Sequence, residues 1–557
     1  MTARGKFILT LVILAIAGLG SYKWWSRFMP AQAGKAAATT AATSGSATTA
    51  KAAKLDTADF VAPLSSCPLL PPAGTFVPKD NTLDLELSEY PGYAGIIVAN
   101  GGLEPTENSV FFRKHGFKVR IKLSEEESWP ALNTGRIAAA ATTVDVLTAY
   151  CRNFQVLAPV QIGFSRGADG IVVRKEIRRI NDLKGRTLVT SQFNESDFFI
   201  RYLTQEAGLG VHMLATPGET PKPDKINLLF AVDAFVAGDL FLKELKSGGQ
   251  RLAGCVTWSP KTTDIVDASN GAAVLLTTNK NLLIIADILV VNKGLAQANP
   301  KMVAGLVAGI LEGNRLVRDN AEPHLDLIGR TFKWDRAKTQ GGLAKVHLSN
   351  LPENLAFYSG AIDAAGSFAG IYSSATLAYG SLIDVPVDAD RYMDATHLTA
   401  LQAAGAFAGQ QIAIVPIRSH ARGALEGDPL LTKDIRFLFE PNSTKLDLSH
   451  QANLTALESI QRLLKVSPGS TILLRGHVDN AMIENFRKQG GETFVRQMAL
   501  KAMELSKTRA TEIRSVLVSR LAVQAARLET VGRGWEEPAG TDAEKNRRVE
   551  VQWFTVE

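Results

Sequence analysis

Two side chains near the C-terminus, Asp479 and Arg509, are of the types that can hold a zwitterionic ligand. They lie in the fragments GHVDN at 476–480 and LSKTRATEI at 505–513. A carboxylate accepts charge-assisted hydrogen bonds from an ammonium group, and an arginine binds a carboxylate through two parallel hydrogen bonds. The alternative for each residue alone is structural: Asp479 could cap a helix, and Arg509 could be a solvated charge on a helix face.

Two further fragments follow in the chain, GRGWEEP at 532–538 and NRRVEV at 546–551. In this order the four fragments resemble the OmpA-like peptidoglycan-binding domain, which holds envelope proteins to the cell wall. The resemblance implies that Asp479 and Arg509 bind the peptidoglycan stem peptide. Arg547, at the start of the last expected strand, could either contact this ligand or form a structural salt bridge.

The resemblance departs from the family pattern in one segment. Asp479 and Arg509 are 30 residues apart, about twice the separation usual in the family. The additional residues, roughly 481–501, are expected to form an inserted loop or helix beside the site. Ala502 also stands where the family tends to have an asparagine, so the fold is better supported than the choice of ligand.

Local sequence patterns indicate which elements position these side chains. Apolar residues at helical spacing predict two amphipathic helices, and alternating or apolar segments predict four strands. The expected helices cover residues 454–464 and 505–521, with Ser506 as a cap, and the expected strands cover 435–439, 471–474, 528–531 and 549–554. These elements predict a two-layer α+β domain of the βαβ type over residues 426–557.

The N-terminus carries one long apolar run, FILTLVILAIAGLG at 7–20, which is followed by Trp24 and Trp25. Extended to Trp25 it has 19 residues, enough for a membrane helix with an aromatic belt at the interface. We therefore expect residues 1–28 to form an uncleaved single-pass transmembrane anchor in the inner membrane, with the bulk of the chain in the periplasm. The alternative is a signal peptide cleaved after residues 31–33.

The run and the segment after it carry two further implications. The run contains no Asp or Glu, so it lacks the carboxylate that a proton-conducting flagellar stator subunit needs in its span. Residues 32–54 are almost entirely Ala, Thr, Ser, Gly and Lys. Such a composition cannot bury enough apolar surface to order the chain. We expect residues 29–84 to be a disordered linker and lead-in.

The composition excludes several classes of function. The net charge is only +6 in 557 residues, without the dense basic stripe of a nucleic-acid-binding protein. Three widely separated cysteines and eight histidines form no metal-ligand spacing, so we expect no metal and no cofactor. Residues 163–167, GFSRG, match the G-x-S-x-G pattern of hydrolases but lead into an expected strand, not a helix. We therefore expect a binding protein and not an enzyme.

Between residues 85 and 425, short apolar segments alternate with helical ones, which is typical of α/β domains. The expected strands include 93–99, 117–123 and 187–190. Together with DLKGR at 182–186 and CVTWSP at 255–260, these segments resemble the nitrate/sulfonate/taurine-type periplasmic binding proteins, the solute receptors of ABC importers. The resemblance implies a small-molecule solute and an ABC permease as a possible partner.

A recurring motif supports a bilobal domain. ADGIVV at 168–173 recurs as ADILVV at 286–291. In the resembled family the chain crosses twice between two lobes, and strands of this character make the crossings. The alternative is that these are two ordinary buried strands.

Open α/β sheets bind ligands at the carboxyl ends of their strands. We therefore expect solute contacts at strand ends, from Asn100, Gly101, Thr142, Thr143, Ser191, Ser196 and Trp258. The backbone amides of residues 191–197 could hold an anion at the start of a helix, but Glu195 and Asp197 would oppose one. Each of these residues could instead be an ordinary turn or cap residue.

These patterns together predict a membrane-anchored periplasmic solute-binding protein that is associated with ABC-type import and moored to peptidoglycan. The alternative is an envelope tether or sensor whose binding-protein domain is structural or regulatory. A polar cleft of ligand size would favour the first function, and a filled cleft would favour the second.

Overall fold

The computed structural model describes residues 55–557 apart from 126–127, 151–152, 362–365, 415–428, 441–442 and 556–557. The expected membrane anchor, and the expected linker up to residue 54, lie outside the described residues. Within the described part of the chain, no helix combines the length and the hydropathy that crossing a membrane requires.

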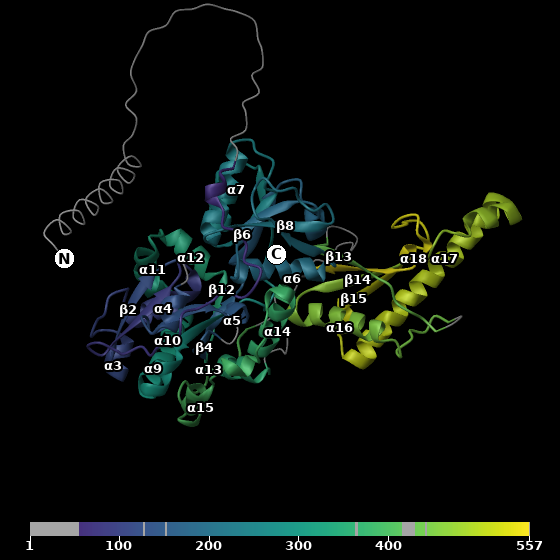
Figure 1. The fold of residues 1–557 in the computed structure, drawn as a ribbon. Helices are drawn as coiled ribbons and strands as arrows, with labels where there is room; N and C mark the ends of the chain where they lie inside the picture. The colour runs from purple at the N-terminus through teal and green to yellow at the C-terminus, as the bar shows by residue number, and fades with distance from the viewer. Residues whose placement is uncertain are drawn as a thin grey trace, which may run out of the picture. The chain divides into compact units, whose positions relative to one another are not determined.

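The first lobe is built on six strands: β1 (Thr82–Leu87), β2 (Lys118–Leu123), β3 (Ala139–Thr143), β4 (Val156–Ser165), β11 (Ala286–Asn292) and β12 (Val346–Leu348). They form one sheet in the order β12-β4-β11-β3-β1-β2. Figure 1 labels β12, β4 and β2 of this sheet. β1, β2 and β3 are parallel, whereas β11 is antiparallel to both β3 and β4. Every residue of β11 is buried, as is usual for a strand in the centre of an α/β sheet.

Helices that belong with the first sheet come from both before and after the second lobe in the chain. They are α2 (Ala94–Asn100), α3 (Val110–His115), α4 (Trp129–Asn133), α5 (Val144–Tyr150), α9 (Lys293–Ala298), α10 (Pro300–Asp319), α11 (Leu325–Phe332), α12 (Arg336–Leu343), α13 (Leu351–Ser359), α14 (Phe368–Tyr379) and α15 (Thr396–Ala403). The helix α10 packs closely on α2, where a Cβ atom on Gly313 would lie 2.0 Å from the carbonyl oxygen of Gly95. Only glycine allows this approach of the two backbones.

The predicted strand at 93–99 is wrong, because these residues belong to a 3₁₀ turn (Pro91–Tyr93) and to α2. A short apolar run does not distinguish a buried strand from a buried helix by periodicity. Gly101 ends the helix in the left-handed conformation, with φ of 79°, and it is a typical helix stop signal. The predicted strands at 117–123 and 187–190 are confirmed by the observed bounds of β2 and of the strand Thr187–Ser191.

The second lobe has its own six-stranded sheet. Its strands are β5 (Asp169–Arg174), β6 (Thr187–Ser191), β7 (Gly210–Met213), β8 (Lys225–Ala231), β9 (Gly254–Trp258) and β10 (Ala273–Thr278), in the order β10-β5-β9-β6-β8-β7. Three helices connect them: α6 (Glu195–Glu206), α7 (Ala234–Lys246) and α8 (Lys261–Ala268). The side chains of Asn194 and Asp233 cap α6 and α7 at their N-termini.

The chain passes between the two sheets at two places. It leaves the first sheet after β4 and enters the second at β5, then returns from β10 to the first sheet at β11. The two A-D motifs therefore form the strands at which the chain enters each sheet. The prediction of a two-lobed α/β domain is confirmed by this topology.

The C-terminal domain contains a four-stranded sheet in the order β13-β16-β14-β15. Its elements are β13 (Leu431–Ile435), α16 (Gln451–Val466), β14 (Thr471–Gly476), α17 (Ile483–Leu521), β15 (Leu528–Gly532), α18 (Ala543–Asn546) and β16 (Val549–Phe554). β14 and β15 are parallel, while β16 is antiparallel to β14 and β13. Both long helices contribute apolar side chains to the buried core. The predicted two-layer α+β domain is confirmed.

The first strand of this domain begins earlier than the predicted strand at 435–439. Leu431 pairs with Trp553, and Ile435 pairs with Val549. Residues after this strand leave the sheet because the side chain of Asn453 holds Leu438, accepting from its amide at 3.0 Å and donating to its carbonyl at 2.7 Å. The segment that contains Phe437 and Phe439 therefore does not pair as a strand, and it lines a cavity of this domain instead.

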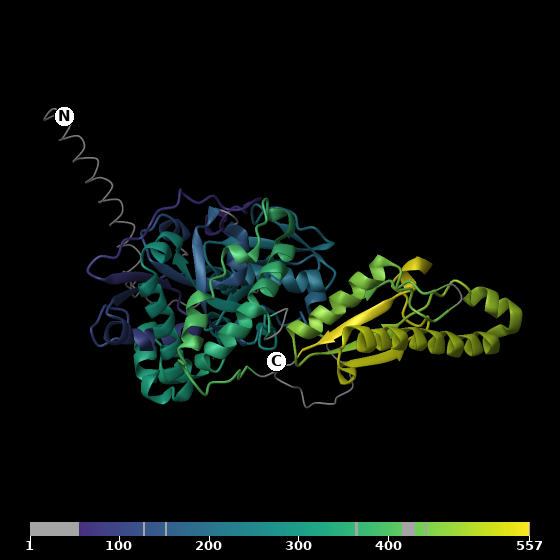
Figure 2. The same cartoon turned by 90° about the horizontal axis from the view of Figure 1, so that it is seen from below.

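The segment expected as an insertion is helical. It forms the N-terminal part of α17, in which Gly490 and Gly491 have non-helical backbone angles and divide the helix in two. Figure 2 shows this helix extending beyond the strands of its sheet before it turns at its N-terminal end. Phe486, before the break, lies against Phe494 and Trp535, with ring centroids 5.9 and 6.1 Å apart.

Candidate functional site

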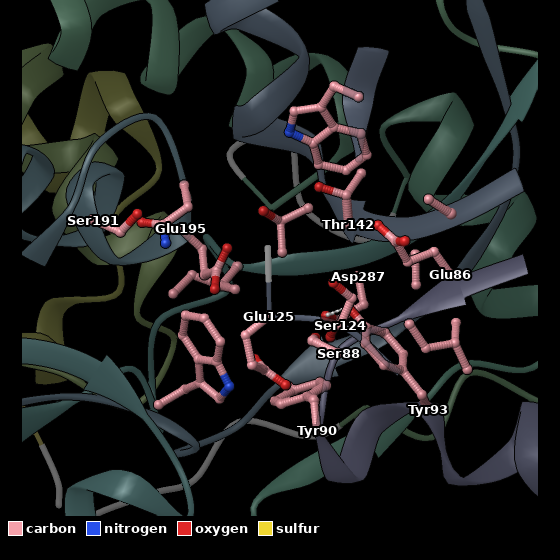
Figure 3. A pocket seen from close by; sticks show the side chains of 18 of the residues that line it. Glu86, Ser88, Tyr90, Tyr93, Ser124, Glu125, Thr142, Ser191, Glu195 and Asp287 are labelled. Carbon is pink, nitrogen blue, oxygen red and sulfur yellow. Dashed lines mark hydrogen bonds between the residues drawn. The ribbon is translucent and has the colours of Figure 1, made fainter. Parts of the chain in front are cut away.

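A cavity of about 340 Å³ is lined by residues from both lobes of the α/β domain (Figure 3). In the first lobe it lies at the carboxyl ends of β1, β2 and β3, which end at Leu87, Leu123 and Thr143. In the second lobe it lies at the ends of β6, β8 and β9. A cavity at the ends of parallel strands in two facing sheets is where α/β proteins bind small molecules.

Four of the seven predicted solute residues line this cavity: Thr142, Thr143, Ser191 and Trp258. The other three are not among its lining residues. Asn100 is fully buried at the end of α2, where its side chain donates to the carbonyls of Gly102 and Val119. Gly101 ends that helix, and Ser196 is buried in the first turn of α6.

The cavity is also lined by carboxyl groups that are not among the predicted solute residues. Asp169 and Asp287 both face it, and the hydroxyl of Tyr93 donates to Asp287 Oδ1 at 3.4 Å. Each is the aspartate of an A-D motif, so the strands that enter the two sheets also place two acids at the cavity. The recurrence of the motif is therefore a sequence signal for these two acids as well as for the crossing of the chain.

The acidic groups around this cavity are hard to ionise. Burial, and secondly the charge of Asp169, raises the pKa of Asp287 well above its ordinary range. Burial raises the pKa of Glu125 to about 7, and it does the same for Asp145, a fully buried residue two positions after Thr143 in the chain. Desolvation disfavours the charged form of a carboxyl group, and nearby negative charges add to the effect.

Aromatic side chains form much of the remaining wall. Tyr90 and Tyr93 meet edge to face with ring centroids 5.1 Å apart, and Trp129 meets Tyr150 in the same way at 6.1 Å. The Trp258 ring packs on Phe235 at 5.2 Å. These contacts hold the rings that line the cavity in fixed positions.

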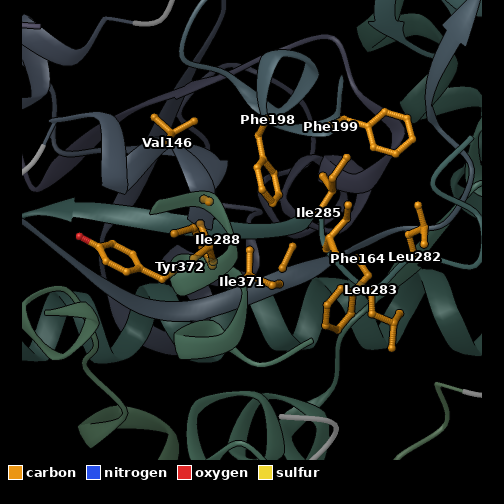
Figure 4. Close-up of a cluster of buried hydrophobic side chains, with 14 of the residues drawn as sticks. Val146, Phe164, Phe198, Phe199, Leu282, Leu283, Ile285, Ile288, Ile371 and Tyr372 are labelled. Carbon is orange, nitrogen blue, oxygen red and sulfur yellow. The ribbon is translucent and has the colours of Figure 1, made fainter. Parts of the chain in front are cut away.

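An apolar cluster supports the strands that carry these groups (Figure 4). Val146 on α5, Phe198 on α6 and Ile288 on β11 are fully buried in it. Tyr372 and Ile371 on α14 belong to the same cluster. The cluster contains side chains from both lobes. It therefore packs the two lobes together beside the strands at which the chain crosses between the sheets.

The C-terminal domain holds Asp479 just after β14. Its Oδ2 atom accepts from Arg547 Nε at 2.8 Å, and its Oδ1 atom accepts from the amide of Ala481 at 3.1 Å. Burial opposes ionisation, but the hydrogen bonds from Arg547 and Ala481 outweigh it and lower the pKa of Asp479. The carboxylate is therefore charged at neutral pH, and Arg547 forms an ion pair with it.

Arg509 projects from α17 into a second cavity, of about 240 Å³. Its guanidinium carbon lies 4.9 Å from the ring centroid of Phe439, which the loop after β13 presents. Its Nε atom is buried and has no hydrogen-bond partner among the described residues. Burial, and secondly the charge of Arg547, lowers the pKa of Arg509, although an arginine remains charged at neutral pH.

Arg509 and Arg547 line this second cavity together, and Asp479 is bonded to Arg547 at its edge. The structure thus brings the three predicted peptidoglycan residues to one place. Arg436, Phe439 and Arg548 also line the cavity and were not selected from the sequence. Ser506 is not a helix cap: it is buried within α17, and its hydroxyl accepts from the amide of Gly534 at 3.0 Å.

The C-terminal domain that carries this cavity also matches a known family, the OmpA family. Residues 438–552 match the model of this family, which confirms the resemblance carried by the four sequence fragments. No curated protein matches this chain.

Solved structures similar to the chain include periplasmic binding proteins. The aliphatic sulphonate binding protein SsuA of Escherichia coli is 16% identical, with a TM-score of 0.42 over 62% of this chain and 99% of its own. The alkanesulfonate-binding protein SsuA of Xanthomonas axonopodis is 14% identical, with a TM-score of 0.43 over 57% and 99%. The nitrate-binding protein NrtA of Synechocystis is 13% identical, with a TM-score of 0.42 over 59% and 90%.

Proposed function

We propose that the chain is a solute-binding protein that is moored to peptidoglycan through its C-terminal domain. The observation that carries the first part is the cavity at the carboxyl ends of six strands, three from each lobe. Its volume of about 340 Å³ falls within the range of small-molecule sites. An open, polar cavity favours solute binding over a purely structural role of this domain.

The C-terminal cavity supports the second part of the proposal. Asp479 is the carboxylate for the ammonium group of the stem peptide, and Arg509, with its buried and unpaired Nε atom, is the guanidinium for the carboxylate. Arg547 contributes as a second ligand contact while it orients Asp479 through their 2.8 Å hydrogen bond. Such charge-assisted hydrogen bonds are the strong ones in recognition of ionised groups.

Residues 7–25 anchor the protein in the inner membrane, with the folded domains in the periplasm. The support is the apolar run of 19 residues with its interfacial tryptophans. An ABC permease would receive the solute from the two-lobed domain. In this proposal the chain acts by binding and not by catalysis.

Native mass spectrometry of the full chain, purified in detergent, tests solute binding. The expected result is a population that carries a bound small molecule, which is lost on unfolding. Only the mass of the bare chain, together with no thermal stabilisation by any small-molecule probe, would contradict the solute-binding function. Removing residues 1–28 should release the protein from membranes in cell fractionation, and retention would contradict the anchor.

A further inference from the structure

The charge of the cavity between the lobes is unusual for an anion site. Among the described residues that line it are five acids, Glu86, Glu125, Asp169, Glu195 and Asp287, and neither Lys, Arg nor His. The buried Arg201 nearby is paired with Asp197 at 2.6 Å, so its charge is already neutralised. Glu86 is paired with Lys122 at 3.0 Å, so the described residues of the wall offer no unpaired cation to an anionic solute. A bound cation would instead favour the ionised form of the other acids.

Unpaired polar atoms on the cavity wall point to missing ligand contacts. Asp287 Oδ2, Thr142 Oγ1 and Trp258 Nε1 make no hydrogen bond within the described residues, and their residues are only 3%, 4% and 6% exposed. A buried polar group without a partner is destabilising, so such groups normally have one. The carboxylate oxygen requires a donor or a positive charge, whereas the indole N–H requires an acceptor.

The aromatic wall favours an organic ion over a bare metal ion. Tyr90, Tyr93, Trp129 and Trp258 line the same cavity as the acids, and aromatic faces attract cations, quaternary ammonium groups above all. Within the described residues, the group of three side chains placed to share one metal ion lies elsewhere, at His477, Glu537 and Glu550. A cavity of about 340 Å³ is also far larger than a metal ion needs.

We infer that the cavity binds a small organic cation, with a positively charged nitrogen near Asp287 and a hydrogen-bond acceptor near Trp258. Figure 3 shows Asp287, Thr142 and Glu125 disposed around the cavity that this solute would fill. The inference rests on the proposed solute-binding function and names the class of its solute. It separates this chain from a receptor of sulfonate or nitrate ions.

The test is a thermal-shift and calorimetric comparison of three probes on the full chain in detergent. Choline carries a permanent positive charge and a hydroxyl acceptor. Dimethylbutanol is its neutral isostere, with carbon in place of nitrogen, and propanesulfonate is the anion. We expect choline to stabilise the protein, dimethylbutanol to do so at least about tenfold more weakly, and propanesulfonate to have no effect.

Two variants connect the effect to the cavity. Asp287→Asn keeps the shape of the side chain and removes its ability to ionise opposite a bound cation, and we expect it to weaken choline binding about tenfold or more. Asp224→Asn, at an exposed position of the second lobe, is the matched control and should bind as the unmodified chain does. Because asparagine can still accept from the Tyr93 hydroxyl and has no acid to bury, Asp287→Asn should fold at least as well.

The outcomes distinguish the two levels of the proposal. Stabilisation by propanesulfonate instead of choline overturns the cation inference and leaves the solute-binding function in place. Equal binding of choline and dimethylbutanol, or unchanged binding by Asp287→Asn, also overturns the inference. Stabilisation by no probe, together with a bare chain in native mass spectrometry, overturns both.

Discussion

Replacing Arg509 by alanine should greatly weaken attachment to the cell wall. The guanidinium lies in the C-terminal cavity with its Nε atom buried and unpaired, and it is held in place over the Phe439 ring. A charge-assisted hydrogen bond is worth about 1.5–3 kcal/mol, so its loss corresponds to roughly a 10- to 100-fold weaker affinity. The affinity of Arg509→Lys for the cell wall should lie between those of the unmodified chain and Arg509→Ala, because lysine keeps the charge without the two parallel donors.

Asp479→Ala should weaken attachment less than Arg509→Ala does. Removing the carboxylate loses the contact to the ligand's ammonium group. It also frees Arg547, which is now bound to Asp479 at 2.8 Å, to pair with the ligand's carboxylate. The double variant Asp479→Ala/Arg509→Ala should lose less than the sum of the two single effects, because both groups orient one ligand.

The assay is co-sedimentation of the full chain, in detergent, with purified peptidoglycan sacculi. Arg520→Ala is the control, since Arg520 lies on the same helix α17 and is exposed. Arg514 is unsuitable because its guanidinium donates to the carbonyls of Leu528 and Ala525. If Arg509→Ala is retained by sacculi as well as Arg520→Ala, the cavity is not the peptidoglycan site.

Three further predictions follow from the buried groups. Choline affinity should rise between pH 6 and pH 8, because the pKa values of Glu125 and of Asp145, which lies near Asp169 and the paired Asp197, are about 7 and a cation binds better to ionised acids. Calorimetry at constant ionic strength measures the affinity, and a flat pH profile would contradict the prediction. The protein without solute should lose stability as pH rises from about 4 to about 7, because these two acids have higher pKa values in the folded than in the unfolded chain. The melting temperature measured across this range should therefore fall, and a rise would contradict the prediction. Gly313→Ala should lower the melting temperature, because its Cβ atom would meet the Gly95 carbonyl at 2.0 Å; an unchanged melting temperature would mean that α10 shifts without cost.

The C-terminal domain could be predicted from local sequence because its signals are local. Four fragments and two amphipathic helices specify the order of elements, and the family match over residues 438–552 agrees with them. The pairing of Asp479 with Arg547 could not be predicted, because the two residues are 68 positions apart. They meet only where β14 and β16 pair in the sheet, Gly476 opposite Val549.

In the α/β domain the sequence determined the class of fold through the alternation of apolar strands and helices and through the recurring A-D motif. It did not determine whether residues 93–99 form a strand or a helix, since a short apolar run suits both and tertiary packing on α10 decides. The acidity of the cavity was also decided by the tertiary structure, for a different reason. Asp169 and Asp287 are far apart in the chain, and only the two crossings between the sheets bring their carboxyl groups to one cavity.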